Sequence, residues 1–482
     1  MSPYQKVAVI GGGLAGLASA VFLARGGKSV TIIEQSTTLG GRARTVDMEG
    51  FYFNQGPHAL FPAGPGVRIL EDLGVKYKGN VVATDNYYII RKGKRYGLPT
   101  KLWHLLTTKL LRGLRGKAEA IKFFASLNKI NLELLQGVSL EEWLDKQFHS
   151  PEVKDLIKLL SRLATYSNDS KTISAAVALS QIKVAFAGGV FYVDEGWQTI
   201  VNSLIDMARN ANVKFVTGKR VGSIGNNNRP GNDSDGRLGW RITLSCGDGD
   251  SVDGRSMDLY FDSIIIADGP KEVYSLLVNN ADINQIFLQQ LKDQINPVRV
   301  ATLDIALSRL PDPDVYGAYG IDAPLYLSLH SAFAKLAPGS GKGVLRAENL
   351  EESEAEAETE GVLFHAMKNL DASVKPDPKA DRDELERFVD MLQPGWRNVV
   401  VRQRFLPNMV VYNTLVQSRQ GGMNGRPDVE VPGTKNLYII GDWVGPEGLL
   451  ADASLSSAKR AAKKILEKAE KNKMAKMVHV SY

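Results

Sequence analysis

A glycine-rich turn close to the N-terminus constrains the fold of this chain more than any other feature. Residues 6–10 are a short apolar run, which is typical of a strand buried on both faces of a sheet. Residues 14–25 have the apolar spacing of a helix and end at a pair of glycines, and residues 29–33 are a second apolar run. The whole segment is therefore predicted to be one βαβ unit, with the glycine turn between its first strand and its helix.

This unit has the features of a dinucleotide-binding site. The spacing G-x-G-x-x-G allows a tight turn, a close approach of the pyrophosphate and close packing of the helix on the strand, and the helix N-terminus meets the phosphate charge. Glu34 ends the second strand, about 20 residues after the glycine turn, and its carboxylate can bind the ribose hydroxyls there. An acidic residue at this place favours FAD or NAD over NADP. The candidate binding residues are Gly11, Gly13, Leu14, Ala15, Gly16, Glu34 and Gln35.

A second glycine-rich segment favours FAD over NAD. Residues 39–45 read Leu-Gly-Gly-Arg-Ala-Arg-Thr and follow directly after the ribose acid. The backbone N–H groups around Gly41 and the guanidinium of Arg42 would give the protein a second set of contacts to the cofactor. Plain nicotinamide dehydrogenases have no such segment, so Gly41 and Arg42 are candidate FAD ligands.

The composition excludes several other kinds of site. The chain has one cysteine, Cys246, which excludes an intramolecular disulfide and any multi-cysteine zinc or iron–sulfur site. A single cysteine also fits a reducing compartment, so a cytoplasmic protein is expected. The net charge is only +6, and its excess lies in two local stretches, residues 101–122 and 459–476. Neither nucleic acid nor a metal ion is expected as a partner.

The basic stretch between residues 101 and 127 alternates leucines and a tryptophan with lysines and arginines. This composition suits an amphipathic helix on an anionic membrane surface, from which an apolar substrate could enter. The alternative is a helix that covers the substrate domain and keeps its lysines in solvent. Outside the βαβ unit no apolar run reaches the roughly 18–20 residues that span a bilayer, so any membrane contact is expected to be peripheral.

Several segments resemble the flavin amine oxidase and phytoene desaturase superfamily. The match is specific near the two ends of the chain and includes the G-G-R-x-R-[ST] element of that superfamily. Through residues 100–190 and 270–400, where a substrate domain would lie, it fades. The segments that carry the resemblance are residues 7–45, 53–58 (Phe-Asn-Gln-Gly-Pro-His), 196–200, 213–224 and 436–443 (Asn-Leu-Tyr-Ile-Ile-Gly-Asp-Trp).

The resemblance implies a non-covalently bound FAD, since the covalent-flavin cysteine of some members is missing. It places Asp442 near the ribityl or pyrophosphate region, the backbone near Val221 at the adenine, and the N-terminus of the last helix at the isoalloxazine. The positive end of that helix would stabilise the anionic reduced flavin. His58 is either an acid–base group or a structural histidine. The residues implied to contact FAD are Gly56, Pro57, His58, Val221, Gly441, Asp442, Leu449 and Leu450.

The fold class implied by the resemblance is α/β, with a Rossmann-like, discontinuous FAD-binding domain of the glutathione-reductase type and an inserted mixed α+β substrate domain. Nucleotide-binding signals at both ends of the chain, with helical and mixed segments between them, agree with this division. The expected FAD-binding domain comprises residues 1–98, 190–272 and 400–482. The expected substrate domain comprises residues 99–189 and 273–399.

Departures from the family pattern bear on the chemistry. Amine oxidases of this superfamily often place a lysine at the flavin N5 edge, but the strand that looks equivalent, residues 298–304, has none, and Arg299 is only an imperfect stand-in. Residues 441–457 read more like the carotenoid desaturase and retinol saturase branch. We therefore expect an FAD-dependent oxidoreductase that desaturates an apolar small molecule, as phytoene desaturase does, with oxygen or a quinone among the candidate electron acceptors.

Two other functions stay open at this point. One is a flavin amine oxidase or a protoporphyrinogen oxidase-like enzyme, and the other is a flavin-bearing protein that binds without catalysis. No Ser/His/Asp grouping or paired carboxylates stand out, and transfer of a hydride to a flavin requires mainly a shaped, dry pocket. No catalytic residue is assigned from the sequence. Tyr319, Tyr326, Phe333, Trp396 and Tyr412 are candidates for the pocket lining, although core packing is favoured for each.

Overall fold

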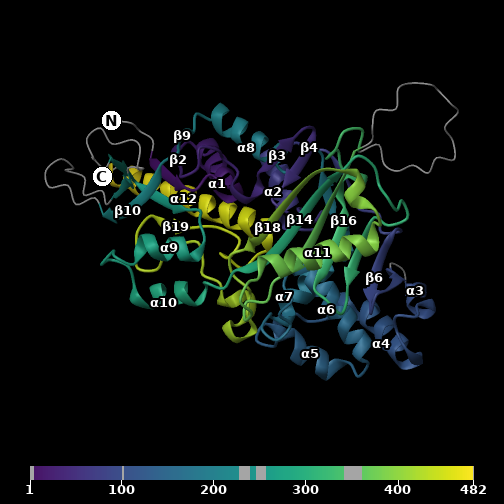
Figure 1. The fold of residues 1–482 in the computed structure, drawn as a ribbon. Coiled ribbons are helices and arrows are strands. Elements are labelled where there is room, and N and C mark those ends of the chain that lie inside the picture. The colour runs from purple at the N-terminus through teal and green to yellow at the C-terminus, as the bar shows by residue number, and fades with distance from the viewer. Residues whose placement is uncertain (1–4, 100–101, 227–238, 246–256, 341–360, 481–482) are drawn as a thin grey trace.

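A five-stranded parallel sheet is built around the N-terminal βαβ unit (Figure 1). Its strand order is β19-β13-β1-β2-β9, and every neighbouring pair is parallel. The structure is a computed structural model that describes residues 5–99, 102–226, 239–245, 257–340 and 361–480. The strands of this sheet are β1 (Lys6–Ile10), β2 (Ser29–Glu34), β9 (Lys214–Thr217), β13 (Ser263–Ile266) and β19 (Leu437–Ile439).

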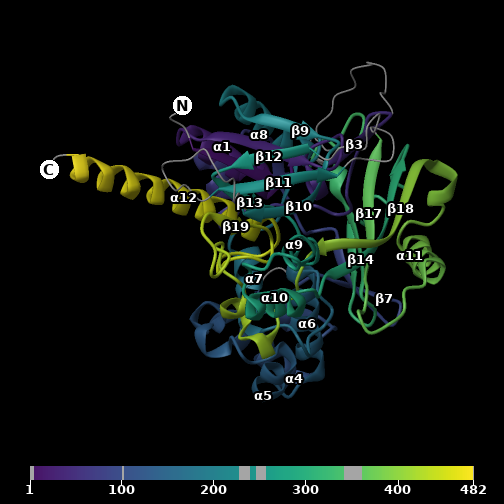
Figure 2. The ribbon, with the colours of Figure 1, turned by 90° about the vertical axis from the view of Figure 1, so that its left-hand side faces the viewer.

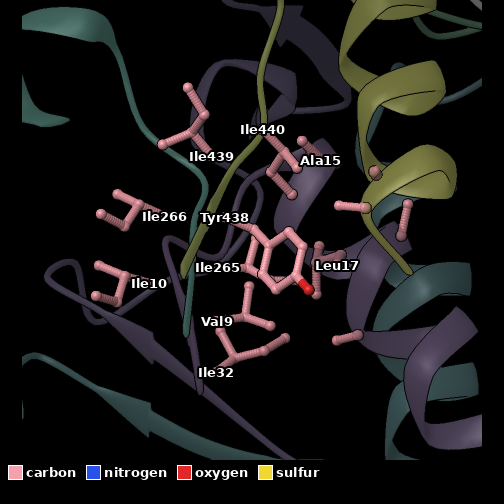
Figure 3. Close-up of a cluster of buried hydrophobic side chains, with 14 of the residues drawn as sticks. Val9, Ile10, Ala15, Leu17, Ile32, Ile265, Ile266, Tyr438, Ile439 and Ile440 are labelled. Carbon is pink, nitrogen blue, oxygen red and sulfur yellow. The ribbon is translucent and has the colours of Figure 1, made fainter. Parts of the chain in front are cut away.

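Apolar residues from adjacent strands form the core of this half. Val9, Ile32 and Ile265 come from β1, β2 and β13, and Figure 3 shows them in one cluster with Leu17 of α1 (Leu14–Arg25) and Tyr438 of β19. The strands carry continuous apolar runs because both faces of the sheet are covered. Complete burial of such a side chain contributes about 1.5–3 kcal/mol.

Three helices besides α1 and a small antiparallel sheet complete this core. Helix α1 packs against α8 (Gln198–Asn210) and α12 (Leu450–Val480), and α12 also packs on α2 (Pro65–Leu73). Figure 2 shows the C-terminal part of α12 extending away from the body of the molecule. The antiparallel sheet contributes apolar residues to the same core and consists of β10 (Arg220–Asn226), β11 (Trp240–Ser245) and β12 (Met257–Phe261).

A second sheet of seven strands has the order β18-β14-β17-β16-β15-β6-β7. Helix α11 (Pro378–Leu392) packs on one face of it, where its buried leucines and Phe388 meet Leu303 and Ile305. Side chains alternate along a strand, so Thr302 and Asp304 belong to the other face. The strands are β6 (Tyr87–Arg91), β7 (Lys94–Gly97), β14 (Val298–Leu307), β15 (Gly317–Gly320), β16 (Leu325–Leu329), β17 (Val362–Asn369) and β18 (Val400–Tyr412).

A group of helices lies at the end of the molecule that is drawn lowest in Figure 1, and it has a core of its own. Two further helices, α9 (Pro270–Leu277) and α10 (Gln285–Asp293), pack on each other. Short strand pairs are formed by β3 (Thr45–Met48) with β4 (Phe51–Asn54), and by β5 (Gly79–Val81) with β8 (Phe191–Val193). The helices of the group are α3 (Leu102–Thr107), α4 (Gly113–Ser126), α5 (Leu140–Gln147), α6 (Pro151–Thr165) and α7 (Ala175–Gly188).

The predicted α/β fold class is confirmed, with a parallel sheet around the βαβ unit and a mixed second sheet. The domain boundaries stay a prediction. Residues 87–97 and 400–412 lie in ranges that the sequence assigned to the FAD-binding domain, yet β6, β7 and β18 hydrogen-bond within the seven-stranded sheet. We therefore propose that these strands belong with the substrate domain.

Residues 101–127 were expected to form a single amphipathic helix, and this expectation is wrong for the residues that the structure describes. Residues 102–107 and 113–126 are two separate helices, α3 and α4, joined by residues 108–112. Leu110 and Leu111 of this connection are buried in the core of the helical group. Within the described part of the chain, none of the helices combines the length and the hydropathy that a bilayer crossing requires.

Candidate functional site

The turn between β1 and α1 forms an open cradle in front of the helix. A Cβ at Gly16 would overlap the carbonyl oxygen of Gly11, so only glycine allows the helix to pack this closely on the turn. Gly11 has a φ of +105°, which favours glycine. Gly13 differs, because its φ is −78° and a Cβ there would meet no atom within 4 Å. Leu14, Ala15 and Gly16 are the first residues of α1, whose first-turn N–H groups lack intrahelical partners. This open, donor-lined space fits a phosphate.

The second glycine segment lies directly beside this turn. The N–H of Gly40 donates to the carbonyl oxygen of Gly12 at 2.8 Å, and a Cβ at Gly41 would be 3.4 Å from the Cα of Gly13. Gly41 has a φ of +55°, a left-handed conformation that carries little cost for glycine. The structure therefore brings Gly41 and Gly13 together at one cradle.

Glu34 turns its carboxylate back onto the glycine turn. Its Oε2 accepts a hydrogen bond from the N–H of Gly12 at 2.7 Å, and its Oε1 accepts one from the N–H of Ser36 at 2.8 Å. A carboxylate can accept about four hydrogen bonds, so acceptor positions remain for ribose hydroxyls. The N–H of Lys219 binds the carbonyl oxygen of Glu34 at 3.1 Å, which brings the start of β10 to the same end. Val221 lies in β10 and is buried, whereas Gln35 is exposed.

Arg42 and Asp442, which are 400 residues apart, form an ion pair. The Nη1 of Arg42 is 2.8 Å from the Oδ2 of Asp442, and it also donates to the carbonyl oxygen of Val411 at 2.8 Å. Asp442 is buried next to Gly441 and accepts a hydrogen bond from the Nδ2 of Asn413 at 2.9 Å. The Arg42 side chain is 44% exposed, so this pair contributes little stability on its own. Its exposed guanidinium stays accessible to a ligand.

Arg426 is a charged residue that the sequence did not single out. It is 8% exposed, and its Nη1 donates to the carbonyl oxygen of Gly448 at 2.9 Å. Its Nε and Nη2 have no hydrogen-bond partner within the described structure, nor does the buried hydroxyl of Tyr412. Burial lowers the pKa of Arg426 to about 10, so the guanidinium stays charged at neutral pH. Two donor nitrogens without a partner, beside Asp442, fit a polar part of the cofactor. The only feature of the sequence that could have identified this residue is its position as a lone arginine between Gly425 and Pro427.

The first turn of α12 is fixed by a buried carboxylate. The Oδ1 of Asp452 accepts a hydrogen bond from the N–H of Gly66 at 3.0 Å, at the start of α2. Burial raises the pKa of Asp452 to about 7. Leu450 has a φ of +57°, which is unfavourable for leucine and is typical of functional sites. Leu449 and Leu450 pack into the core of the helical group, so this helix start joins the parallel sheet to the helices.

The Gly-Pro segment reaches the seven-stranded sheet at Thr302. A Cβ at Gly56 would lie 3.1 Å from the Cγ2 of Thr302, and the carbonyl oxygen of Pro57 is 3.4 Å from the hydroxyl of Tyr166. His58 binds the carbonyl oxygen of Gly56 through Nδ1 at 3.1 Å, and its ring stands edge-to-face on Trp197 at 5.2 Å. Burial lowers the pKa of His58 to about 4, so it is neutral at neutral pH.

Arg299 does not take the place of the missing lysine. Its Nη1 donates to the carbonyl oxygen of Asn408 at 3.3 Å, and by strand alternation its side chain belongs to the sheet face opposite Thr302. The residues that face the Gly-Pro segment at Gly56 are Met409 and Thr302, and the buried Oγ1 of Thr302 has no partner among the described residues.

The face of the seven-stranded sheet that carries Thr302 is polar and buried. The hydroxyl of Tyr192 lies 3.1 Å from the Oγ of Ser328 and 3.2 Å from the hydroxyl of Tyr326. Tyr87 also binds Ser328, at 2.8 Å, and Tyr326 binds the Nε2 of His330 at 3.2 Å. Burial raises the pKa values of these tyrosines and lowers that of His330, so the whole network is uncharged near neutral pH.

Of the aromatics considered from the sequence, Tyr319 and Tyr326 stack at 5.6 Å beside this network. Tyr412 lies beside Arg426 and packs in the core of the helical group. Trp396 packs under α11 on the opposite face of the sheet, and Phe333 contributes to the apolar clusters nearby. Within the described ranges no cluster of three or more His, Cys, Asp or Glu residues is suited to a metal ion, and Cys246 lies outside those ranges.

Comparison with known proteins gives a family match over most of the chain. Residues 14–466 match the model of the flavin-containing amine oxidoreductases. A curated relative, the 4,4′-diaponeurosporene oxygenase of Staphylococcus aureus, is 26% identical over 256 residues, which are 46% of this chain and 50% of the relative. The chain thus spans about half the length of the curated relatives it matches.

Solved structures share the fold across the whole chain. An oxidoreductase from Methanosarcina mazei has a TM-score of 0.68 at 17% identity, with 96% of this chain and 100% of that chain covered. A triple mutant of putrescine oxidase has a TM-score of 0.67 at 16% identity, with 96% and 99% covered. At these identities the likeness shows the fold alone. The family match identifies the cofactor as FAD and the protein as an oxidoreductase. The chain therefore belongs to the family of flavin-containing amine oxidoreductases.

Proposed function

We propose that the protein desaturates a neutral, apolar small molecule in an FAD-dependent two-electron oxidation. The observation that carries this proposal is the neutrality of the sheet face next to Gly56 and Pro57. Its tyrosines and His330 are uncharged near neutral pH, and its one carboxylate among the described residues, Asp304, is bound by Arg404 and His365. A cationic amine would need a free counter-charge when it leaves water, and this face offers none.

The relative from Staphylococcus aureus gives independent support. It is named for 4,4′-diaponeurosporene, a carotenoid, which fits an apolar substrate. The strand that meets the Gly-Pro segment, β14, has no lysine, which is also compatible with a substrate other than an amine. We accordingly favour a polyene or a similar apolar hydrocarbon, and amine or porphyrinogen oxidation become outcomes of the test.

FAD supplies the two-electron acceptor of this reaction when it is bound. We propose that the cradle at Gly13 and Gly41 holds its pyrophosphate, that Glu34 binds its ribose, and that Arg42 and Asp442 bind the adjoining polar region. The unpartnered N–H groups of Arg426 would contact the same cofactor. The Gly56–His58 segment and the start of α12 would flank the flavin ring, with the sheet face at Thr302 on the substrate side.

We further propose that the substrate enters from an anionic membrane surface at α3 and α4. Trp103, Leu106 and Leu114 are 58%, 54% and 87% exposed there. Exposed cationic side chains lie on the same two helices and their connection, at Lys109, Arg112 and Arg115. Exposed apolar side chains with cationic neighbours are the features by which interfacial helices bind anionic lipid.

The first test is the visible spectrum of the purified protein, followed by anaerobic mixing with polyenes, porphyrinogens and amines in detergent micelles. For non-covalent FAD we expect twin flavin bands at about 375 and 450 nm, and heat should release the flavin into solution. Bleaching by a polyene supports the proposal. Bleaching by amines or porphyrinogens alone overturns the choice of substrate. A bound flavin that no compound reduces would favour a non-catalytic binding protein.

A further inference from the structure

Three strands of the seven-stranded sheet place an arginine, an aspartate and a histidine side by side. Arg404 of β18, Asp304 of β14 and His365 of β17 are direct cross-strand neighbours. The Oδ2 of Asp304 is 2.6 Å from the Nη2 of Arg404, and its Oδ1 is 2.7 Å from the Nδ1 of His365. Asp304 and His365 are 0% exposed. The carboxylate therefore orients the imidazole, with Nδ1 directed at Asp304 and Nε2 directed away from it.

Several polar atoms on this face have no partner. The Nε2 of His365, the Nδ1 of His330 and the Oγ1 of Thr302 are all buried without a hydrogen bond in the described parts of the chain. Each buried polar group left unpaired costs about 1–3 kcal/mol. These three groups lie beside the Gly56 segment, and water molecules rather than an apolar hydrocarbon would supply their hydrogen bonds. None of the described residues occupies the Nε2 of His365, which is therefore free to accept a proton from a substrate held against this face.

The groups around His365 favour proton transfer at its Nε2. Asp304 supplies a negative charge that stabilises an imidazolium, and Arg404 holds that carboxylate in place. The ring of His330 is 4.4 Å away, with Tyr192 stacked on it at 3.7 Å and Tyr326 bound to its Nε2. His58 is a further titratable neighbour among the described residues, and a positive charge on His365 lowers the pKa of His58. Asp304 is therefore the residue that can stabilise a proton arriving here.

We propose that His365 is the base that accepts the substrate proton, and that Asp304 is its positioning residue. This inference rests on the proposed function. Desaturation removes two hydrogens from adjacent carbons of the substrate. One would leave with its electron pair as a hydride, for which FAD is the two-electron acceptor when it is bound, and the other would leave as a proton, which forms a bond to the Nε2 of His365. The electron pair of the second C–H bond becomes the new double bond, so the substrate is oxidised by two electrons.

The kinetic test compares His365→Gln with His149→Gln, a matched change at an exposed histidine on the helical group. Anaerobic flavin reduction by the compound found in the screen is followed by stopped flow between pH 5 and 9. We expect the reduction rate of His365→Gln to be about 10²–10⁴-fold below that of the wild type. The control should keep the wild-type profile. An unchanged rate in His365→Gln with full flavin content would overturn the assignment.

The positioning role is tested first by the tautomer of His365, which needs no turnover. Holoenzyme with ¹⁵N-labelled histidine is compared by NMR with Asp304→Asn, and His365→Gln assigns the resonance. In the wild type we expect the proton on Nδ1 of His365 and a bare Nε2 at pH 8.5. The amide that Asp304→Asn introduces can donate to Nδ1 instead, so the proton should move to Nε2 in that variant and the reduction rate should fall about tenfold or more. A wild-type proton on Nε2 would refute the inference, even if no compound reduced the flavin.

Discussion

Replacement of Gly13 by alanine should separate cofactor binding from folding. Gly13 has an ordinary φ of −78°, and a Cβ there would point into open space, with no atom within 4 Å. The same change at Gly16 would drive a Cβ into the carbonyl oxygen of Gly11. Gly13→Ala should therefore leave the apoprotein intact while it fills the place of the phosphate. Gly16→Ala should damage the fold itself.

The expected magnitudes follow from these contacts. Gly13→Ala should change the free energy of unfolding of the apoprotein by less than about 1 kcal/mol, since alanine tolerates this conformation and mainly restricts the unfolded chain. A methyl group forced against a bound phosphate costs about 1–3 kcal/mol. Because about 1.4 kcal/mol is a factor of ten, FAD should bind roughly 10–100-fold more weakly. At a fixed FAD concentration well above the Kd, the holoprotein loses that same free energy of stabilisation.

Denaturant unfolding with and without FAD, combined with a fluorescence titration of the apoprotein, measures both quantities. Gly97→Ala is the matched control, because Gly97 has open space around its Cβ position but lies on the exposed strand β7. The control should bind FAD as the wild type does. If Gly13→Ala bound FAD with wild-type affinity, the phosphate would not lie at this turn and our placement of the cofactor would be wrong.

Three further predictions concern other parts of the molecule. The raised pKa of Asp452, about 7 against an ordinary 3.9, means that the wild type loses stability as pH rises from about 4 to 7. The free energy of unfolding of Asp452→Asn, measured in urea, should equal that of the wild type near pH 4 and exceed it at pH 8 by up to about 4 kcal/mol. The lowered pKa of His58, about 4, gives stability that is present above about pH 6.5 and lost as pH falls. As the pH falls from 7.5 to 5, the free energy of unfolding should therefore decrease by about 2 kcal/mol less in His58→Asn than in the wild type. Replacement of Trp103, Leu106 and Leu114 together by serine should weaken the affinity for anionic vesicles, measured by co-sedimentation, by about tenfold or more. A variant that sediments with the vesicles as strongly as the wild type would refute the membrane contact. Because these side chains are exposed, the Tm should stay unchanged.

The sequence predicted the N-terminal βαβ unit to the residue for its helix and its first strand. Residues 6–10 and 14–25 were expected, and the structure has β1 over Lys6–Ile10 and α1 over Leu14–Arg25. This succeeded because every determinant is local: an apolar run, a glycine turn and a glycine stop. The resemblance also implied a last helix after Gly441 and Asp442, and the structure has α12 there, directly after the apolar strand β19 and the Gly-Asp segment.

Long-range pairings could not be predicted in this way. Arg42 and Asp442 were each singled out as cofactor ligands, but nothing in the sequence indicates that they bind each other. Arg426 lies in a turn without any periodic pattern. The contacts of Asp304 with His365 and Arg404 were missed because they depend on strand register. His365 is 61 residues and Arg404 is 100 residues from Asp304 in the sequence. A shift of one residue in either strand would send these side chains to the opposite face.

The two faces of the seven-stranded sheet explain how one set of strands can serve both stability and chemistry. Along β14, Leu303 and Ile305 pack under α11, whereas Thr302 and Asp304 alternate with them toward the Gly-Pro segment. A substitution at a site-facing position changes no contact with α11, so its effect on the fold is limited to its own polar partners. Asp304 is the exception, because its loss would leave Arg404 without its buried counter-charge, at a cost of about 3–5 kcal/mol. The chemistry at Thr302 can therefore vary more freely than that at Asp304, which the fold also requires.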